Sequence, residues 1–138
     1  MEILARCLAP GDAEGDLTFL SSPLSFWGGF DVATGRVIDR SHSACGEVLT
    51  GRIVVMTSGR GSSSTSSILA EAIRIGTAPA GLVLEEPDPI ITVGAIVAAQ
   101  LYGKMCPVVV CSRESLVALS AFRRIRITAI QGSDVSFT

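Results

Sequence analysis

The chain has 138 residues, a length typical of one domain, and we expect a single domain over residues 1–138. Apolar residues make up 48% of the sequence and charged residues 17%, with a net charge of −2. This composition excludes a disordered chain, and the lack of a basic stripe argues against binding to nucleic acid or an anionic membrane. The high apolar content also indicates that a partner covers part of the surface.

No segment of the sequence is typical of secretion or membrane insertion. The first residues contain no basic region followed by an apolar core, and the longest apolar stretch, residues 90–101, is shorter than the ~20 residues that span a bilayer. We therefore expect a soluble, cytoplasmic protein. In that reducing compartment the four cysteines favour free thiols, with a single cysteine near an active site as the alternative. Their spacing matches no CxxC pair or ferredoxin-type run, so the sequence alone encodes no metal site.

Short strands separated by turns are predicted in the N-terminal half. Apolar and β-branched runs at residues 3–8, 16–20 and 36–39 are typical of strands. Proline, glycine and aspartate at residues 10–12, and Ala-Thr-Gly at residues 33–35, predict turns between them.

From Gly51 onward, the pattern changes to an alternation of strands and helices. The expected strands cover residues 52–57, 80–84 and 108–111, and the expected helices cover residues 66–76, 92–102 and 114–123. Two further strands, 125–131 and 135–137, are expected to be joined by a hairpin at Gly132-Ser133-Asp134. The whole pattern predicts an α/β fold in which helices pack outside a compact, barrel-like sheet.

The most informative motif is Gly59-Arg60-Gly61-Ser62-Ser63-Ser64, which lies between a predicted strand and a predicted helix. It is not a Walker A loop, because it lacks the lysine, and Ser64 stands where a dinucleotide fingerprint has its third glycine. A turn of this kind directs hydroxyls at the free N–H groups of a helix start, which bind anions and stabilise developing negative charge. Those groups, with Arg60 nearby, would activate the Ser62 hydroxyl.

The alternative is that this serine run only caps a helix. Serine is a favoured N-cap residue, which accounts for one of the hydroxyls. Residues 62–67 contain five serines and one threonine, and these have poor helix propensity. Capping therefore leaves most of the run unexplained, and a ligand-binding or catalytic loop remains an equal interpretation.

Two other features could contribute to a site. In residues 23–31, Trp27 is followed by two glycines and an acid, so it offers an apolar wall to a small ligand, or else anchors a loop in the core. His42 is the only histidine and is a candidate for acid–base catalysis, although a solvated or structural role is the alternative. The acidic run at residues 85–88 is interpreted as a solvated turn.

Taken together, several motifs resemble the small subunit of aconitase X. They are Gly59-Arg60-Gly61-Ser62-Ser63-Ser64, Pro23-Leu24-Ser25-Phe26-Trp27-Gly28-Gly29, Gly76-Thr77-Ala78-Pro79, Gly35-Arg36-Val37-Ile38-Asp39 with His42, and Val93-Gly94-Ala95 leading to Pro107-Val108-Val109. The resemblance covers nearly the whole chain. It implies a swivelling β/β/α domain like the mobile domain of aconitase, here a separate polypeptide that docks on a large subunit to form a heterodimer or larger complex.

The resemblance also implies a hydro-lyase chemistry. The large subunit would carry an iron–sulfur cluster, this chain would bind no cofactor itself, and Ser62 would be the general base that takes the substrate proton. From their positions, Arg60, Gly61, Ser63, Ser64 and Trp27 are expected to contact a small hydroxy acid substrate.

Two activities belong to the resembled family. One is dehydration of cis-3-hydroxy-L-proline to 1-pyrroline-2-carboxylate in bacteria, and the other is dehydration of (R)-5-phosphomevalonate in archaea. Three motifs look more like the bacterial two-subunit form, so hydroxyproline is the expected substrate: Phe26-Trp27-Gly28-Gly29, Arg60-Gly61-Ser62-Ser63-Ser64 and Leu101-Tyr102-Gly103. The alternatives are the phosphomevalonate enzyme and a non-catalytic regulatory module.

Overall fold

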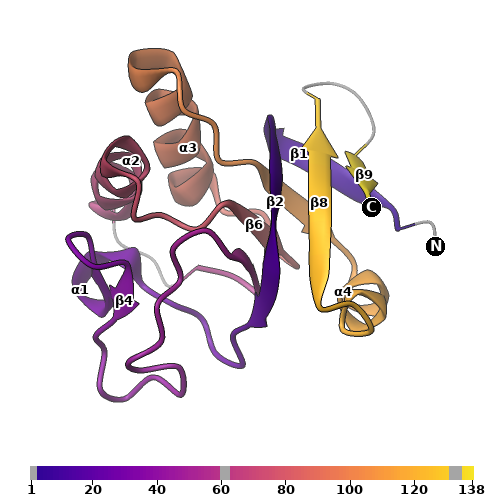
Figure 1. Cartoon of the computed structure of the whole chain (residues 1–138), viewed down its shortest axis with the longest axis horizontal. Coiled ribbons are helices and arrows are strands. Elements are labelled where there is room, and N and C mark those ends of the chain that lie inside the picture. The colour runs from indigo at the N-terminus through magenta and orange to yellow at the C-terminus, as the bar shows by residue number, and fades with distance from the viewer. Residues whose placement is uncertain (1–2, 60–62, 131–134) are drawn as a thin grey trace.

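A curved, seven-stranded mixed sheet forms the centre of the computed structural model, which describes residues 3–59, 63–130 and 135–138 (Figure 1). The strand order is β1-β7-β6-β5-β2-β8-β9. The strands are β1 (Ala5–Ala9), β2 (Gly11–Phe19), β5 (Ile53–Met56), β6 (Gly81–Leu84), β7 (Val108–Cys111), β8 (Arg124–Ala129) and β9 (Val135–Phe137). The edge strands β1 and β9 contact each other, so the sheet nearly closes into a barrel. The predicted barrel-like α/β fold is confirmed.

The four central strands β7, β6, β5 and β2 run parallel, and their carboxyl ends share one edge of the sheet. In β5 and β6 every residue is buried, as expected for continuous apolar runs that are covered on both faces. Strands β1, β8 and β9 join antiparallel at the two sides. In sheets of this kind, ligands bind outside the carboxyl ends of the parallel strands.

Helices cover both faces of the sheet. Helices α2 (Thr65–Ile75) and α3 (Pro89–Tyr102) pack together on one face, where Val54 and Met56 of β5 join their core. Helix α4 (Arg113–Leu119) packs on the other face, where Ile53 and Val55 contribute to a second core. None of the helices in the described parts of the chain has the length and apolar character needed to cross a bilayer.

The structure corrects the predicted turn at residues 10–12. Only Pro10 separates β1 from β2, and the two strands do not form a hairpin, because β1 pairs with β7 whereas β2 pairs with β5 and β8. Strand β2 is longer than predicted because its polar side chains face outward and meet arginines of β8. In one such pair, Arg126 lies 2.5 Å from Asp12 and lowers the pKa of that carboxyl through hydrogen bonding.

Other element boundaries also differ from prediction. Helix α3 begins at Pro89 rather than residue 92, because Asp88 caps it and proline fits its first turn. Helix α4 ends at Leu119 rather than residue 123. The turn at residues 33–35 is confirmed: it joins β3 (Phe30–Asp31) to β4 (Arg36–Val37), with Gly35 at a φ of +73°. The pairing of β8 with β9 is confirmed as well, but its predicted turn at 132–134 lies outside the described residues.

Candidate active site

The predicted strand–turn–helix arrangement around the serine run is confirmed. Strand β5 ends at Met56, at the shared carboxyl edge of the parallel strands, and helix α2 begins at Thr65. We call residues 59–64 the serine turn. Three predicted site residues, Arg60, Gly61 and Ser62, lie outside the described residues, whereas Ser63 and Ser64 are exposed at the start of α2.

The start of α2 does not support capping as the whole explanation of the serine run. The N-cap residue Ser64 makes no side-chain capping bond to the helix. The Ser66 hydroxyl instead donates to the carbonyl of Ile90 at 2.6 Å, which fastens the first turn of α2 to the start of α3. The Thr65 hydroxyl is buried, and no group among residues 3–59, 63–130 and 135–138 bonds to it. A buried hydroxyl without a partner costs about 1–3 kcal/mol, so Thr65 does not stabilise the start of α2 through its hydroxyl.

The first residue of the serine turn is held from two sides. Gly59 forms a parallel β-bridge with Leu24, and on its other side a Cβ atom at position 59 would lie 2.3 Å from Oδ2 of Asp88 and 2.7 Å from Cδ1 of Ile91. Its φ is not in the positive range, so glycine is required here for space and not for backbone conformation. The turn therefore starts from a fixed point.

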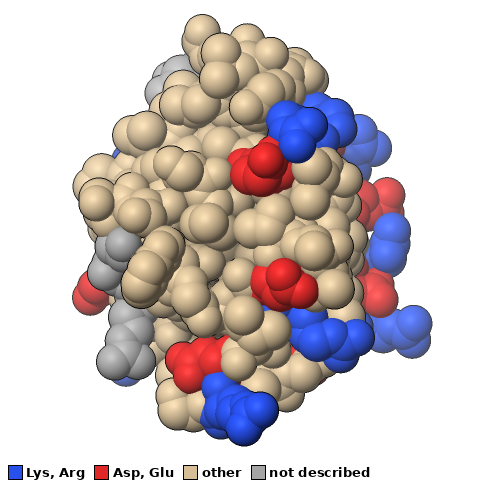
Figure 2. Space-filling model, turned by 90° about the vertical axis from the view of Figure 1, so that its left-hand side faces the viewer, with Lys and Arg blue, Asp and Glu red and all other residues tan. Residues whose placement is uncertain are grey.

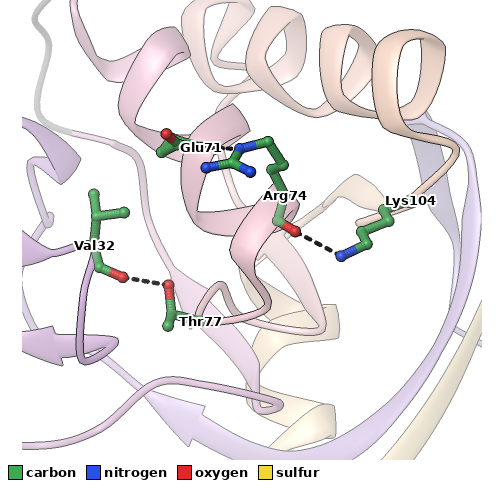
Figure 3. Close-up of polar contacts among 5 residues, drawn as sticks. All are labelled: Val32, Glu71, Arg74, Thr77 and Lys104. Atoms are coloured by element: carbon green, nitrogen blue, oxygen red, sulfur yellow. Dashed lines mark hydrogen bonds and ion pairs between the residues drawn. The ribbon is translucent and has the colours of Figure 1, made fainter.

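The opposite end of α2 is also tied down (Figure 3). The Thr77 hydroxyl donates to the carbonyl of Val32 at 2.6 Å, and the Lys104 ammonium donates to the carbonyl of Arg74 at 2.6 Å. Arg74 itself pairs with Glu71 one turn earlier in the helix. Because both ends of α2 are anchored, the fold sets the direction of the helix axis, and with it the direction of the helix dipole whose positive end lies at Thr65.

The aromatic segment predicted to join the site does lie beside the serine turn, through the bridge between Leu24 and Gly59. Its short element α1 (Phe26–Gly29), in which Trp27 and Gly28 depart from helical φ/ψ, buries Phe26, whose ring meets Phe30 edge to face at 5.3 Å. Trp27 points the other way and is 57% exposed. Phe26 is therefore the core anchor of the segment, and the Trp27 side chain is accessible to a ligand or partner.

His42 is a structural residue in this fold. It is buried, its Nδ1 accepts the backbone N–H of Ala44 at 3.0 Å, and its Nε2 lies 3.0 Å from the carbonyl of Ser22. Since Nδ1 accepts, Nε2 carries the proton and donates to that carbonyl. Both ring nitrogens are engaged by backbone groups, which fastens the loop after β4 to the segment that leads into Leu24. The structural alternative for His42 is the one that the geometry supports.

The cysteines are free thiols where the structure describes them, as predicted. Burial raises the pKa of Cys106 to about 12 and that of Cys111 to about 11, and it also raises the pKa of Cys7, while Cys45 is exposed. Metal clusters bind thiolates, which these buried groups disfavour. Within the described ranges, no three histidine, cysteine or acidic residues gather where they could hold a metal ion. These cysteines do not fit an iron–sulfur cluster.

Asp88 is a residue that the sequence interpretation missed. The acidic run was interpreted as a solvated turn, but the Asp88 carboxylate caps α3 by accepting the N–H groups of Ile90 and Ile91, each at 3.0 Å. Aspartate directly before a proline and an apolar helix is a capping signal that was available in the sequence. Glu85 also has a partner, since it pairs with Arg113 at 3.1 Å.

Comparison with known families decides the assignment. The family model described as the aconitase X swivel domain matches residues 2–136. The chain belongs to this family. In agreement, the structure of this chain superposes on the crystal structure of Thermococcus kodakaraensis aconitase X with a TM-score of 0.80. The two sequences are 27% identical, and the superposition covers 99% of this chain and 97% of that one.

Two curated relatives of this swivel domain differ in size and in name. A cis-3-hydroxy-L-proline dehydratase from Pseudomonas aeruginosa is 43% identical over 125 residues, which are 91% of this chain and 21% of that protein. A phosphomevalonate dehydratase small subunit from Methanopyrus kandleri is 49% identical over 83 residues, which are 60% of this chain and 62% of that protein. The chain thus spans about a fifth of the length of the hydroxyproline relative. Both relatives are dehydratases, so a dehydratase assignment is supported at the level of the family.

Proposed function

We propose that this chain, as one swivelling domain over residues 1–138, is the small subunit of a cytoplasmic hydro-lyase that converts cis-3-hydroxy-L-proline to 1-pyrroline-2-carboxylate. The observation that carries this proposal is the extent of the match. Relatives named cis-3-hydroxy-L-proline dehydratase align with 91% of the chain, whereas those named phosphomevalonate dehydratase small subunit align with 60–71% of it. Because the match to the hydroxyproline relatives extends over more of this chain, hydroxyproline is the favoured substrate.

The organisation of the polypeptides favours a second candidate, the small subunit of phosphomevalonate dehydratase. This chain covers 62–75% of several such small subunits, which are separate polypeptides of similar size. It covers only 21% of the hydroxyproline relative, in which the matching region belongs to a much longer chain. Substrate turnover distinguishes the two candidates.

The proposed chemistry starts at Ser62. Its hydroxyl, as the alkoxide, takes the proton from the substrate carbon that carries the carboxylate, while the hydroxyl on the adjacent carbon departs, so that water is eliminated and a C=C bond forms between the two carbons. The resulting enamine becomes 1-pyrroline-2-carboxylate when the ring nitrogen loses its proton and the carbon that carried the hydroxyl gains one. The described flanks support this role, since the turn joins the carboxyl edge of the sheet to the positive end of α2, where negative charge is stabilised. Arg60 would bind the substrate carboxylate or lower the pKa of the Ser62 hydroxyl.

The remaining contacts are assigned from position. Gly61 would let the turn approach the substrate closely, and Ser63 and Ser64 would orient it through their hydroxyls. Trp27 would supply an apolar wall, which its 57% exposure supports. An iron–sulfur cluster, which the family resemblance assigns to the large subunit, would act as a Lewis acid on the departing hydroxyl.

A large subunit is the proposed partner. On the side of the molecule that carries α1, α2 and α3, the upper and left part of the view shows a broad area without charge, whereas charged residues lie in the middle, along the right-hand side and at the bottom (Figure 2). Helix α3 contains no charged residue at all, yet several of its apolar side chains face solvent: Val93, Ile96, Val97 and Leu101. A helix that is apolar all round is normally buried, which supports a partner on this side.

The test is turnover of cis-3-hydroxy-L-proline and of (R)-5-phosphomevalonate by this chain co-expressed with its large subunit. Turnover of hydroxyproline alone is expected, and the isolated chain is expected to be inactive. Turnover of the phosphorylated acid alone would replace the first candidate with the second, and Arg60→Ala should then weaken binding of that substrate specifically. Failure to turn over either substrate, in a complex that assembles, would refute both candidates and favour a regulatory module.

A further inference from the structure

The start of α3 packs against Gly59 and Ser66 and fixes one carboxylate in place. Oδ1 of Asp88 accepts two backbone N–H groups, from Ile90 and Ile91, each at 3.0 Å. The Thr92 hydroxyl in turn donates to the carbonyl of Asp88 at 2.8 Å. The carboxylate therefore cannot rotate away without loss of the helix cap.

The second oxygen of this carboxylate faces the first residue of the serine turn. A Cβ atom at position 59 would lie 2.3 Å from Oδ2 of Asp88, whereas ordinary contact begins at 3.4 Å. Leu24 bridges Gly59 from the other side. Gly59 is thus paired with Leu24 through its backbone and meets the Asp88 carboxylate where a side chain would project.

The first turn of α2 rests on the same helix. The Ser66 hydroxyl donates to the carbonyl of Ile90 at 2.6 Å, and Gly94 leaves room for the backbone of Ser66, since a Cβ atom there would lie 2.8 Å from its carbonyl oxygen. Gly59, the first residue of the serine turn, and Ser66, in the first turn of α2, therefore both contact the first two turns of α3.

We propose that Asp88 is a positioning residue for the serine turn, an inference that rests on the proposed role of this turn in dehydration. A capping role alone does not require a side chain of this shape, because serine caps helices equally well. What aspartate has and serine lacks is a second terminal atom, here Oδ2, which lies against Gly59. A proton-abstracting group must be held to within about 0.5 Å, and a 1 Å displacement can reduce a rate by about 100-fold.

The experiment separates the cap from the contact with Gly59. Asp88→Ser keeps a capping oxygen but removes Oδ2, whereas Asp88→Asn keeps both the cap and the shape. We expect Asp88→Ser to fold with a Tm close to that of the wild type and to lose roughly 10- to 100-fold in kcat in the assembled complex, with a much smaller change in KM. Asp88→Asn should stay within about threefold of the wild-type kcat.

A second pair of variants tests the contact directly. Gly59→Ala should lower kcat by about 100-fold through its clashes with Oδ2 of Asp88 and Cδ1 of Ile91. Adding Asp88→Ser removes the closer of the two clashing atoms and should recover roughly tenfold of that loss, whereas adding Asp88→Asn should recover none. Recovery in both double variants, or in neither, would overturn the proposal.

Amide hydrogen exchange over residues 57–66 of the same complexes gives a readout that does not depend on activity. Faster exchange in Asp88→Ser, but not in Asp88→Asn, is expected. Unchanged exchange together with an unchanged kcat in Asp88→Ser would refute the positioning role while the dehydratase proposal stands. If the wild-type complex proves inactive, the proposed function fails, and the exchange data alone decide whether Asp88 positions the turn.

Discussion

Gly94 of α3 offers a direct test of how closely α2 and α3 pack together. In a helix interior, Gly→Ala normally stabilises a protein by about 1 kcal/mol, because alanine has the higher helix propensity. Here a Cβ atom would lie 2.8 Å from the carbonyl oxygen of Ser66 and 3.1 Å from its Cα, and both are backbone atoms. The helices would have to separate by roughly half an ångström, because backbone atoms cannot rotate aside as a side chain does.

The clash outweighs the gain in propensity. Overpacking of a close-packed core costs about 1–3 kcal/mol, and separation of the helices also weakens the hydrogen bond from Ser66 to Ile90, worth about 1 kcal/mol. After the propensity gain is subtracted, Gly94→Ala should lower the free energy of unfolding by about 2 kcal/mol. For a chain of this size, that loss corresponds to a fall in Tm of roughly 6–10 °C.

Urea and thermal unfolding followed by circular dichroism measure this effect. Ser67→Ala is the matched control, because Ser67 is an exposed helical residue where the change in propensity acts without a clash. It should be neutral or slightly stabilising. A Gly94→Ala variant at least as stable as the wild type would refute the close contact between the two helices.

Three further predictions concern buried polar groups and thiols. Thr65→Val should leave stability unchanged or raise it by about 1 kcal/mol in urea unfolding, because it removes a buried hydroxyl that has no partner in the described part of the chain; a clear loss would mean that the hydroxyl is bonded. His42→Ala should lower the free energy of unfolding by about 2 kcal/mol or more, since two backbone groups lose their partner, and an unchanged Tm would contradict that role. In native protein at pH 8, a thiol reagent should modify Cys45 quickly and Cys106 and Cys111 only after unfolding. Burial raises the pKa of Cys106 to about 12 and that of Cys111 to about 11, so both thiols ionise at a lower pH in the unfolded chain than in the folded one. The free energy of unfolding should therefore keep its full value below pH 9 and fall as the pH rises toward 11–12. Rapid labelling of either thiol in the native protein would refute this.

Much of the fold could be predicted because strand and helix patterns are local. The apolar runs that became β5, β6 and β7 are short, β-branched and bounded by turn residues, so their type and position were predicted to within a residue or two. The order of strands could not be predicted in the same way. Strand β2 shows why: its outward carboxylates became interpretable only once β8 supplied arginines, as in the pair of Asp12 with Arg126.

The candidate site could be predicted in part. The serine turn was recognisable from its glycines and hydroxyls between a strand and a helix, and the structure describes both flanks as expected. The contact between Gly59 and Asp88 was not predicted, because the two residues lie far apart in the sequence and meet only when α3 packs against Gly59. The exposure of Trp27 beside the buried Phe26 was equally invisible, since both are aromatic residues in an irregular segment.

The most direct test of the proposed function is turnover of cis-3-hydroxy-L-proline by the assembled complex that carries Ser62→Ala, with Ser63→Ala for comparison. We predict that Ser62→Ala assembles normally with the large subunit but loses essentially all turnover, because no group remains to take the proton, whereas Ser63→Ala loses less. If the Ser62→Ala complex retained most of the wild-type turnover, the serine would not be the base, and the central claim would be wrong.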